Sequence, residues 1–110
     1  MKSLICGLAA SLLLPTLAAA LSPEETAAEF MRAREASSLA RNGDADATKR
    51  AFEQFARLTE AHPQQPLYRV YYGSAYCLKA RDAWFPFTKL SHVDTGTDLI
   101  GKALAAELLE

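Results

Sequence analysis

Apolar residues recur every three or four positions along most of residues 21–110, and turns containing glycine or proline separate the segments with this pattern. Such spacing places apolar side chains on one side of an α-helix, whereas a half-buried strand needs strict alternation, and no segment alternates convincingly. The spacing therefore predicts an all-α fold of about five short helices. Because the turns are short, we expect antiparallel helix hairpins.

The first helix has clear signals at both ends. Ser22 is a favourable N-cap, Pro23 suits the first helical position, and Glu25 completes a capping box. Gly43 ends the helix. The residues expected to face inward are Ala27, Phe30, Met31, Ala33, Ser37 and Ala40.

The second helix is expected to begin at Asp44 or Asp46 and to end before Pro63. Its apolar stripe has helical spacing, while most of its charged residues face water. The stripe consists of Ala51, Phe52, Phe55 and Leu58.

The third helix follows Gln65 and Pro66 and occupies most of residues 67–84, a stretch that holds all four tyrosines and the single tryptophan of the chain. Charged residues are few in this stretch, so the helix is apolar over most of its circumference. Such a helix is normally packed on more than one side. We therefore expect it to be the central helix of the fold.

The remaining segment is predicted as a short helix that starts at Asp82 or at Pro86, a break near Gly96, and a last helix capped by Thr97. The residues expected to face inward on the last helix are Leu99, Ile100, Ala103, Leu104 and Leu108. The aromatic run Trp84–Phe87 either fills the core or forms an exposed docking patch. We expect it to fill the core.

Residues 1–20 have the layout of a secretory signal peptide: Lys2, then an uncharged apolar run, then small residues up to Ala20. The run is short for a membrane-spanning helix, which needs about 20 apolar residues. We expect cleavage after Ala20, a helical domain over residues 21–110, and a periplasmic or secreted protein. The alternative is a retained anchor, which would make the chain a membrane-tethered accessory protein.

The bulk composition excludes some partners. The formal net charge is −1, so no basic excess exists to neutralise phosphates, and nucleic acid is not an expected partner. The two histidines and two cysteines show no metal-binding spacing, so neither a metal nor another cofactor is expected. No catalytic residue set is recognisable, and we expect no enzymatic activity.

At the second and third helices the pattern resembles the tetratricopeptide repeat. Ala51, Phe55 and Pro63 match the small residue, the aromatic residue and the terminal proline of such a repeat's second helix. With the period of about 34 residues, Gly73 and Tyr76 fall on the small and aromatic positions of the next first helix. The resemblance covers about residues 27–105 and is to exported bacterial proteins of this kind. It implies a scaffold that binds peptides or partner proteins and catalyses nothing itself.

The candidate binding residues lie on the third helix. Tyr68, Tyr72 and Tyr76 fall in one row at a spacing of four, and Arg69 stands beside them with Lys79 to hold a carboxylate. Tyrosine and arginine are enriched among residues that dominate binding energy. The alternative is that the tyrosines pack internally and that Gly73 lets a neighbouring helix approach closely.

Cys77 supports a different hypothesis. Cleavage after Ala20 removes Cys6, so Cys77 has no partner for an internal disulfide. Burial as a small apolar residue is the expected role, while a thiol-dependent redox protein and an intermolecular disulfide are the alternatives. A homo-oligomer is therefore among the possible states.

Overall fold

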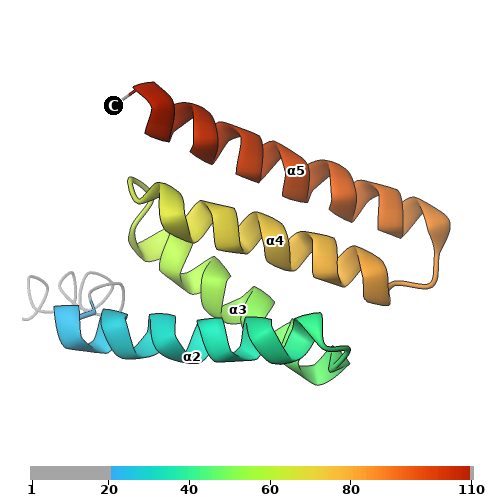
Figure 1. Ribbon diagram of the computed structural model, residues 1–110, viewed down its shortest axis with the longest axis horizontal. Helices are drawn as coiled ribbons and strands as arrows, with labels where there is room; N and C mark the ends of the chain where they lie inside the picture. The colour runs from blue at the N-terminus through green and yellow to red at the C-terminus, as the bar shows by residue number, and fades with distance from the viewer. Residues whose placement is uncertain (1–20, 110) are drawn as a thin grey trace, which may run out of the picture.

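The computed structural model describes residues 21–109, and these form four helices (Figure 1). In chain order they are α2 (Pro23–Arg41), α3 (Ala45–Ala61), α4 (Pro66–Asp82) and α5 (Pro86–Leu109). The predicted all-α fold of antiparallel hairpins is confirmed, with four helices in the described residues where about five were expected. The predicted signal peptide lies outside them.

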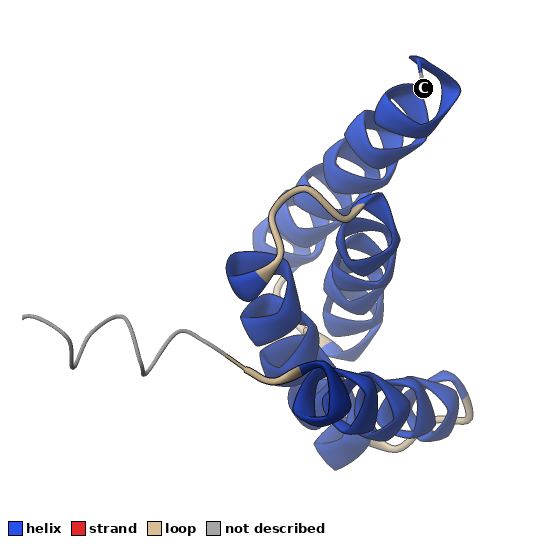
Figure 2. Ribbon diagram, turned by 90° about the vertical axis from the view of Figure 1, so that its left-hand side faces the viewer, coloured by secondary structure: helices blue, strands red, loops and turns tan. Residues whose placement is uncertain are grey.

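Each helix packs against the next one along the chain. The contacts of α4 are extensive with α3 and α5 and sparse with α2. Figures 1 and 2 accordingly place α2 and α5 at opposite ends of the arrangement. The prediction that the tyrosine-rich helix is central is confirmed.

The helix ends follow the local signals in the sequence. The Ser22 hydroxyl accepts a hydrogen bond from the amide of Glu25, and the Glu25 carboxylate accepts one from the amide of Ser22. Gly43 has a φ of 107°, a conformation that glycine adopts without strain, and it reverses the chain between α2 and α3. Asp44, one of the two predicted caps, accepts a hydrogen bond from the amide of Ala47 and starts α3.

The core lies between α2 and α3 and is covered by the aromatic side chains of α4. Its buried residues are Ala33, Ala36, Ala51, Phe55 and Leu58. The alanines have small side chains, so the two helix backbones approach closely around Phe55. Met31, which was expected to face inward, is exposed, and so is Ala27.

A partly buried ion pair joins α2 to α3. Glu29 is buried, and its carboxylate lies 2.9 Å from Arg57 Nε on α3 and 3.2 Å from Arg32 on its own helix. The hydrogen bond from Arg57 is the main cause that lowers the pKa of Glu29, and Arg32 adds to it. The charged carboxylate is thus held where burial alone would favour the neutral acid.

Two glycines bring α4 and α5 into close contact. A Cβ atom added to Gly73 would lie 2.6 Å from the carbonyl oxygen of Gly96, and a Cβ added to Gly96 would lie 2.6 Å from that of Gly73. No real Cβ atom tolerates such a distance. The proposal that Gly73 admits a neighbouring helix is therefore confirmed, and Gly96 is the matching residue on that helix.

The predicted break near Gly96 is wrong, because α5 runs without interruption from Pro86 to Leu109. Gly96 is buried in the crossing with α4 and does not end a helix. Thr97 caps nothing: its hydroxyl donates to the carbonyl of Val93 at 2.8 Å, inside the helix. Of the residues expected inward, Ala103 is buried, whereas Leu104 is exposed. The later of the two predicted starts, Pro86, is the correct one.

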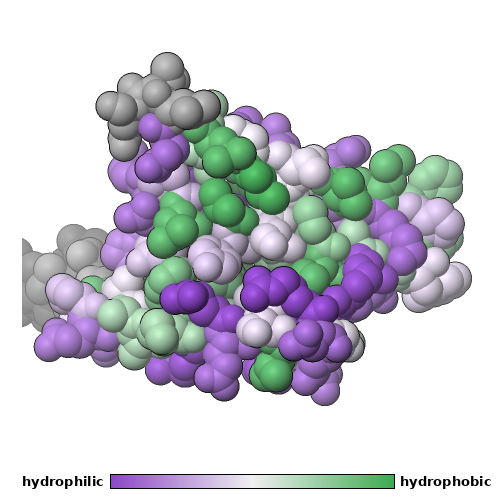
Figure 3. Space-filling model, in the orientation of Figure 1, coloured by the Kyte–Doolittle hydropathy of each residue, from purple (hydrophilic) through white to green (hydrophobic). Residues whose placement is uncertain are grey.

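The expectation that Trp84–Phe87 fills the core is also wrong. Trp84 is 87% exposed and Phe87 is 75% exposed. These residues lie at the turn between α4 and α5, beyond the end of the core, where Trp84 and Phe87 each pack against Phe85 with ring centroids 5.8 Å apart. On the face of the molecule seen in Figure 3, hydrophobic residues gather over α4 and α5, and mostly hydrophilic residues lie along α2.

Candidate binding surface

The four tyrosines of α4 divide between two aromatic clusters. Tyr68 and Tyr71 turn toward α2, where the Phe30 ring lies 5.4 Å from the first and 5.6 Å from the second. Tyr71 also stacks on the buried Phe55 at 4.8 Å, with the two rings nearly parallel. This first cluster is continuous with the core and holds α4 on the first hairpin.

The second cluster lies on the side of α4 between α3 and α5. The Tyr72 and Tyr76 rings are 5.1 Å apart and contact Phe52 of α3 at 5.3 and 4.8 Å. His92 of α5 lies 5.8 Å from Tyr76. All four side chains are half-buried, so this surface, hereafter the Tyr72–Tyr76 surface, remains open to solvent.

Two cations stand beside this surface. The Lys79 amino group lies 4.0 Å from the centre of the Phe52 ring, within the range of a cation–π contact. Arg69 is half-buried, and its Nε atom makes no hydrogen bond to any residue that the structure describes. The Nε atom is buried, so any hydrogen bonds that Arg69 donates to a carboxylate or backbone carbonyl of a ligand come from the terminal nitrogens of its guanidinium.

The Tyr72 hydroxyl of this surface acts as a neutral hydrogen-bonding group. Burial raises the pKa of Tyr72 to about 12, and the neighbouring Tyr76 hydroxyl and the Glu60 carboxylate contribute to the rise. At neutral pH Tyr72 therefore remains protonated and can both donate and accept a hydrogen bond. This chemistry suits recognition of polar groups on a ligand.

The structure brings together part of the predicted tyrosine row. Tyr72 and Tyr76 are neighbours, with Arg69 on the same helix, whereas Tyr68 belongs to the first cluster with Phe30 and lies 5.7 Å from His62. Two members of the surface, Phe52 and His92, were not among the predicted site residues. Phe52 was recognisable as part of an apolar stripe, but its outward position depends on how α4 crosses α3.

Cys77 lies at the α4–α5 crossing. It is half-buried, and its sulfur would be 2.9 Å from a Cβ atom added to Gly96. The residues that the structure describes contain no group of three or more potential metal-ligating side chains.

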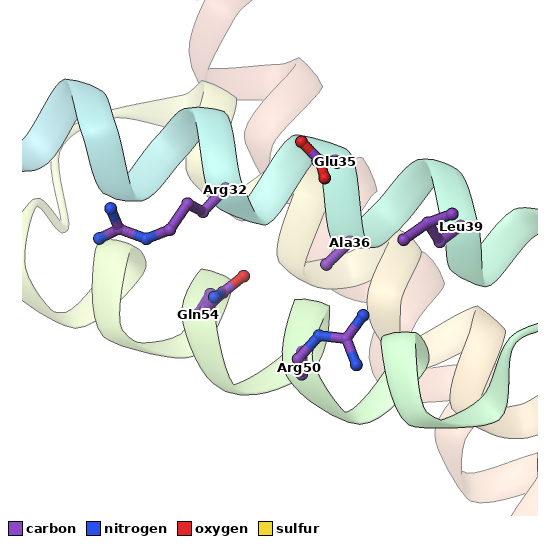
Figure 4. A pocket seen from close by; sticks show the side chains of 6 residues that line it. All are labelled: Arg32, Glu35, Ala36, Leu39, Arg50 and Gln54. Carbon is purple, nitrogen blue, oxygen red and sulfur yellow. The ribbon is translucent and has the colours of Figure 1, made fainter.

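A polar hollow of about 260 Å³ lies between α2 and α3 on another side of the molecule (Figure 4). Its lining residues are Arg32, Glu35, Ala36, Leu39, Arg50 and Gln54. Arg32 is already paired with Glu29, and the hollow offers no aromatic side chain to a ligand. The Tyr72–Tyr76 surface is therefore the better candidate for binding.

Comparison with known protein families, with curated proteins and with solved structures finds no match to this chain. Within residues 21–109, none of the helices combines the length and the apolar character that crossing a bilayer requires.

Proposed function

We propose that this chain is an exported helical-repeat protein, similar to tetratricopeptide proteins, that binds a peptide or protein partner and catalyses no reaction. The supporting observation is the composition of the Tyr72–Tyr76 surface: half-buried aromatic rings from three helices with the Lys79 cation over one of them and Arg69 on the same helix as the tyrosines. Aromatic and arginine side chains are the residues that most often dominate the energy of protein interfaces.

The surface favours a ligand that is extended and carries an acidic group or a free carboxylate. The rings of Tyr72, Tyr76 and Phe52 offer flat apolar contacts, while Arg69 and Lys79 supply positive charge at the edge. The Tyr72 hydroxyl, whose pKa is raised to about 12, is neutral at physiological pH and able to bond the ligand backbone. Recognition would thus combine ring stacking with charge-assisted hydrogen bonds.

A comparison of two cation–π pairs tests the assignment. Lys79 lies over Phe52 in the proposed surface, whereas Arg34 lies 5.8 Å from the Phe30 ring at the first cluster. A Tyr72→Ala/Lys79→Ala variant and an Arg34→Ala control would each be used to recover partners from the compartment where the protein resides. We expect the control to retain the partner and the double variant to lose it.

Circular dichroism would first establish that both variants are folded. Equal recovery of every partner by the two variants would refute the proposed surface. Export has its own test, the mass of the protein recovered from the cell. A chain beginning at Leu21 supports cleavage of the predicted signal peptide, and an intact Met1 indicates a retained segment.

A further inference from the structure

One side of α5 carries a stripe of exposed, mostly apolar residues beside its contact with α4. The stripe consists of Leu90, Val93, Thr97 and Leu104, all of them exposed. At 100° per residue these four residues fall within roughly 60° of one another, beside the face that packs on α4. Leu90 is 60% exposed and Leu104 is 54% exposed. We call this set the outer stripe.

Gly101 borders the outer stripe and has no role within the described fold. A glycine inside a helix costs about 1 kcal/mol relative to alanine, so its presence normally reflects a need for space. Gly73 and Gly96 meet this need at the α4–α5 crossing. A Cβ atom added to Gly101, in contrast, would meet nothing within 4 Å. The close approach of another backbone at this position would explain the glycine.

We propose that the outer stripe is the contact surface of a homodimer, in which α5 of a second copy crosses α5 antiparallel near Thr97 and Gly101. The side chains of the outer stripe are large at its two ends, Leu90 and Leu104, and smaller at its centre, Thr97. A two-fold axis at the small centre places the Leu90 end of each copy against the Leu104 end of the other. Self-complementarity of this kind is what a two-fold interface requires.

The polar group at the centre of the stripe does not oppose burial. The Thr97 hydroxyl already donates to the carbonyl oxygen of Val93, so a dimer would leave no unsatisfied donor there. The formal net charge of −1 gives little repulsion between two copies. Antiparallel alignment also places opposite ends of the two helix dipoles side by side.

The exposed aromatic turn enlarges the apolar area next to the stripe. Phe87 lies one helical turn before Leu90, and Trp84 packs on its neighbour Phe85. At 87% and 75% exposure, Trp84 and Phe87 alone present on the order of 300 Å² to solvent. With the outer stripe, the exposed apolar surface reaches the few hundred Å² at which such a patch is often functional. The dimer surface does not include Tyr72 or Tyr76, so the test of the dimer is independent of the proposed ligand site.

Sedimentation of the chain, in the form recovered from the cell, tests the dimer. We expect a concentration-dependent monomer–dimer equilibrium that Leu90→Glu weakens by at least about tenfold, because a buried charge would have no partner. Met31→Glu is the matched control, since Met31 on α2 is also 60% exposed. A wild-type chain that stays monomeric at all concentrations, or an equal effect of both substitutions, would overturn the proposal.

Disulfide trapping tests the geometry without a destabilising charge. In a Cys77→Ser background, Thr97→Cys should form an intermolecular disulfide, because residue 97 lies near the two-fold axis. Leu104→Cys is the control. In the antiparallel arrangement, residue 104 of one copy is separated from residue 104 of the other by roughly 15–20 Å, at a rise of 1.5 Å per residue. Trapping at residue 104 but not 97 would overturn the antiparallel dimer. A chain trapped at neither position would also overturn the proposal.

Discussion

Single residues with small side chains decide how closely the helices of this protein approach. Alanines at the α2–α3 contact are fully buried, and Gly73 and Gly96 bring the backbones of α4 and α5 into direct contact. Interiors packed to this density have no room for added atoms. Stability at these positions is therefore sensitive to one methyl group.

Gly96→Ala should destabilise the protein by about 1–3 kcal/mol, the typical cost of overpacking. Its methyl group would lie 2.6 Å from the carbonyl oxygen of Gly73 and could be accommodated only by separating the two helices. Chemical denaturation measures the change in the free energy of unfolding. Gly101→Ala is the control: in dilute solution it should stabilise the monomer by about 0.5–1 kcal/mol, because its added methyl group meets nothing. Equal destabilisation by the two substitutions would contradict the close crossing.

Tyr72 should ionise at a higher pH than an ordinary tyrosine side chain, because burial raises its pKa. Its folded pKa of about 12 exceeds the ordinary value of 10.0, so the folded state holds this proton more tightly than the unfolded state does. The stability that this provides is complete below pH 10 and is lost as the pH rises toward 12. Ultraviolet titration measures the tyrosinate absorbance, and Tyr72→Phe should remove the late component. A titration of the folded wild type without a late component would contradict the burial of this hydroxyl.

At the level of the helices, local signals predicted the ends well and tertiary contacts explain the errors. The caps of α2 and α3 depend on residues within four positions of one another, so Ser22, Glu25 and Asp44 were recognisable from sequence. Gly96 and Thr97 together are typical of a helix boundary, yet the contact with Gly73 keeps α5 continuous. That contact joins residues far apart in the chain, and no local pattern reveals it.

The sequence predicted only part of the candidate site, again because the rest depends on contacts between residues far apart in the chain. A spacing of four places Tyr68, Tyr72 and Tyr76 in one row on an isolated helix. In the fold, Phe30 on α2 contacts Tyr68, while Phe52 and His92 complete the surface around the other two. Which aromatic ring each tyrosine contacts thus depends on the crossing angles of three helices, which the sequence pattern does not specify.

Lys89→Met should weaken the junction between α4 and α5. The Lys89 amino group donates to the carbonyl oxygens of Ala80 and Arg81 at 3.2 and 3.1 Å, where α4 ends and its dipole is negative. Loss of this cation should cost about 0.5–1 kcal/mol in the free energy of unfolding. Lys102→Met is the control, since its pair with Asp98 is exposed and i, i+4 spaced, and it should cost less. The two variants would be compared by thermal denaturation, and identical melting temperatures would contradict the capping role.

Over the whole molecule, packing is uneven. The central helix, α4, packs against both α3 and α5, whereas α5 packs extensively against α4 alone, and only Gly96 and Ala103 are buried among its residues 86–107. Regions with fewer buried contacts open at lower free energy than the core. The second hairpin is therefore expected to contain the least stable helix of the fold.

Amide hydrogen exchange should show this difference directly. We expect the amides of α5 to exchange through openings of lower free energy than those of α3 and α4, measured by mass spectrometry on peptic fragments. If the proposed dimer forms, protection of α5 should rise with protein concentration while that of α3 stays constant. Uniform protection of all helices at every concentration would contradict the uneven packing.

The contact between Gly73 and Gly96 also limits how this protein can evolve. Each residue is confined by a backbone oxygen of the other, and a backbone atom is the same whatever side chain follows. A larger residue at one position therefore has no compensating substitution at the other, unlike a pair of interlocking side chains whose volumes can be exchanged. A search for second-site suppressors of Gly96→Ala should recover changes elsewhere in the helices and none at residue 73.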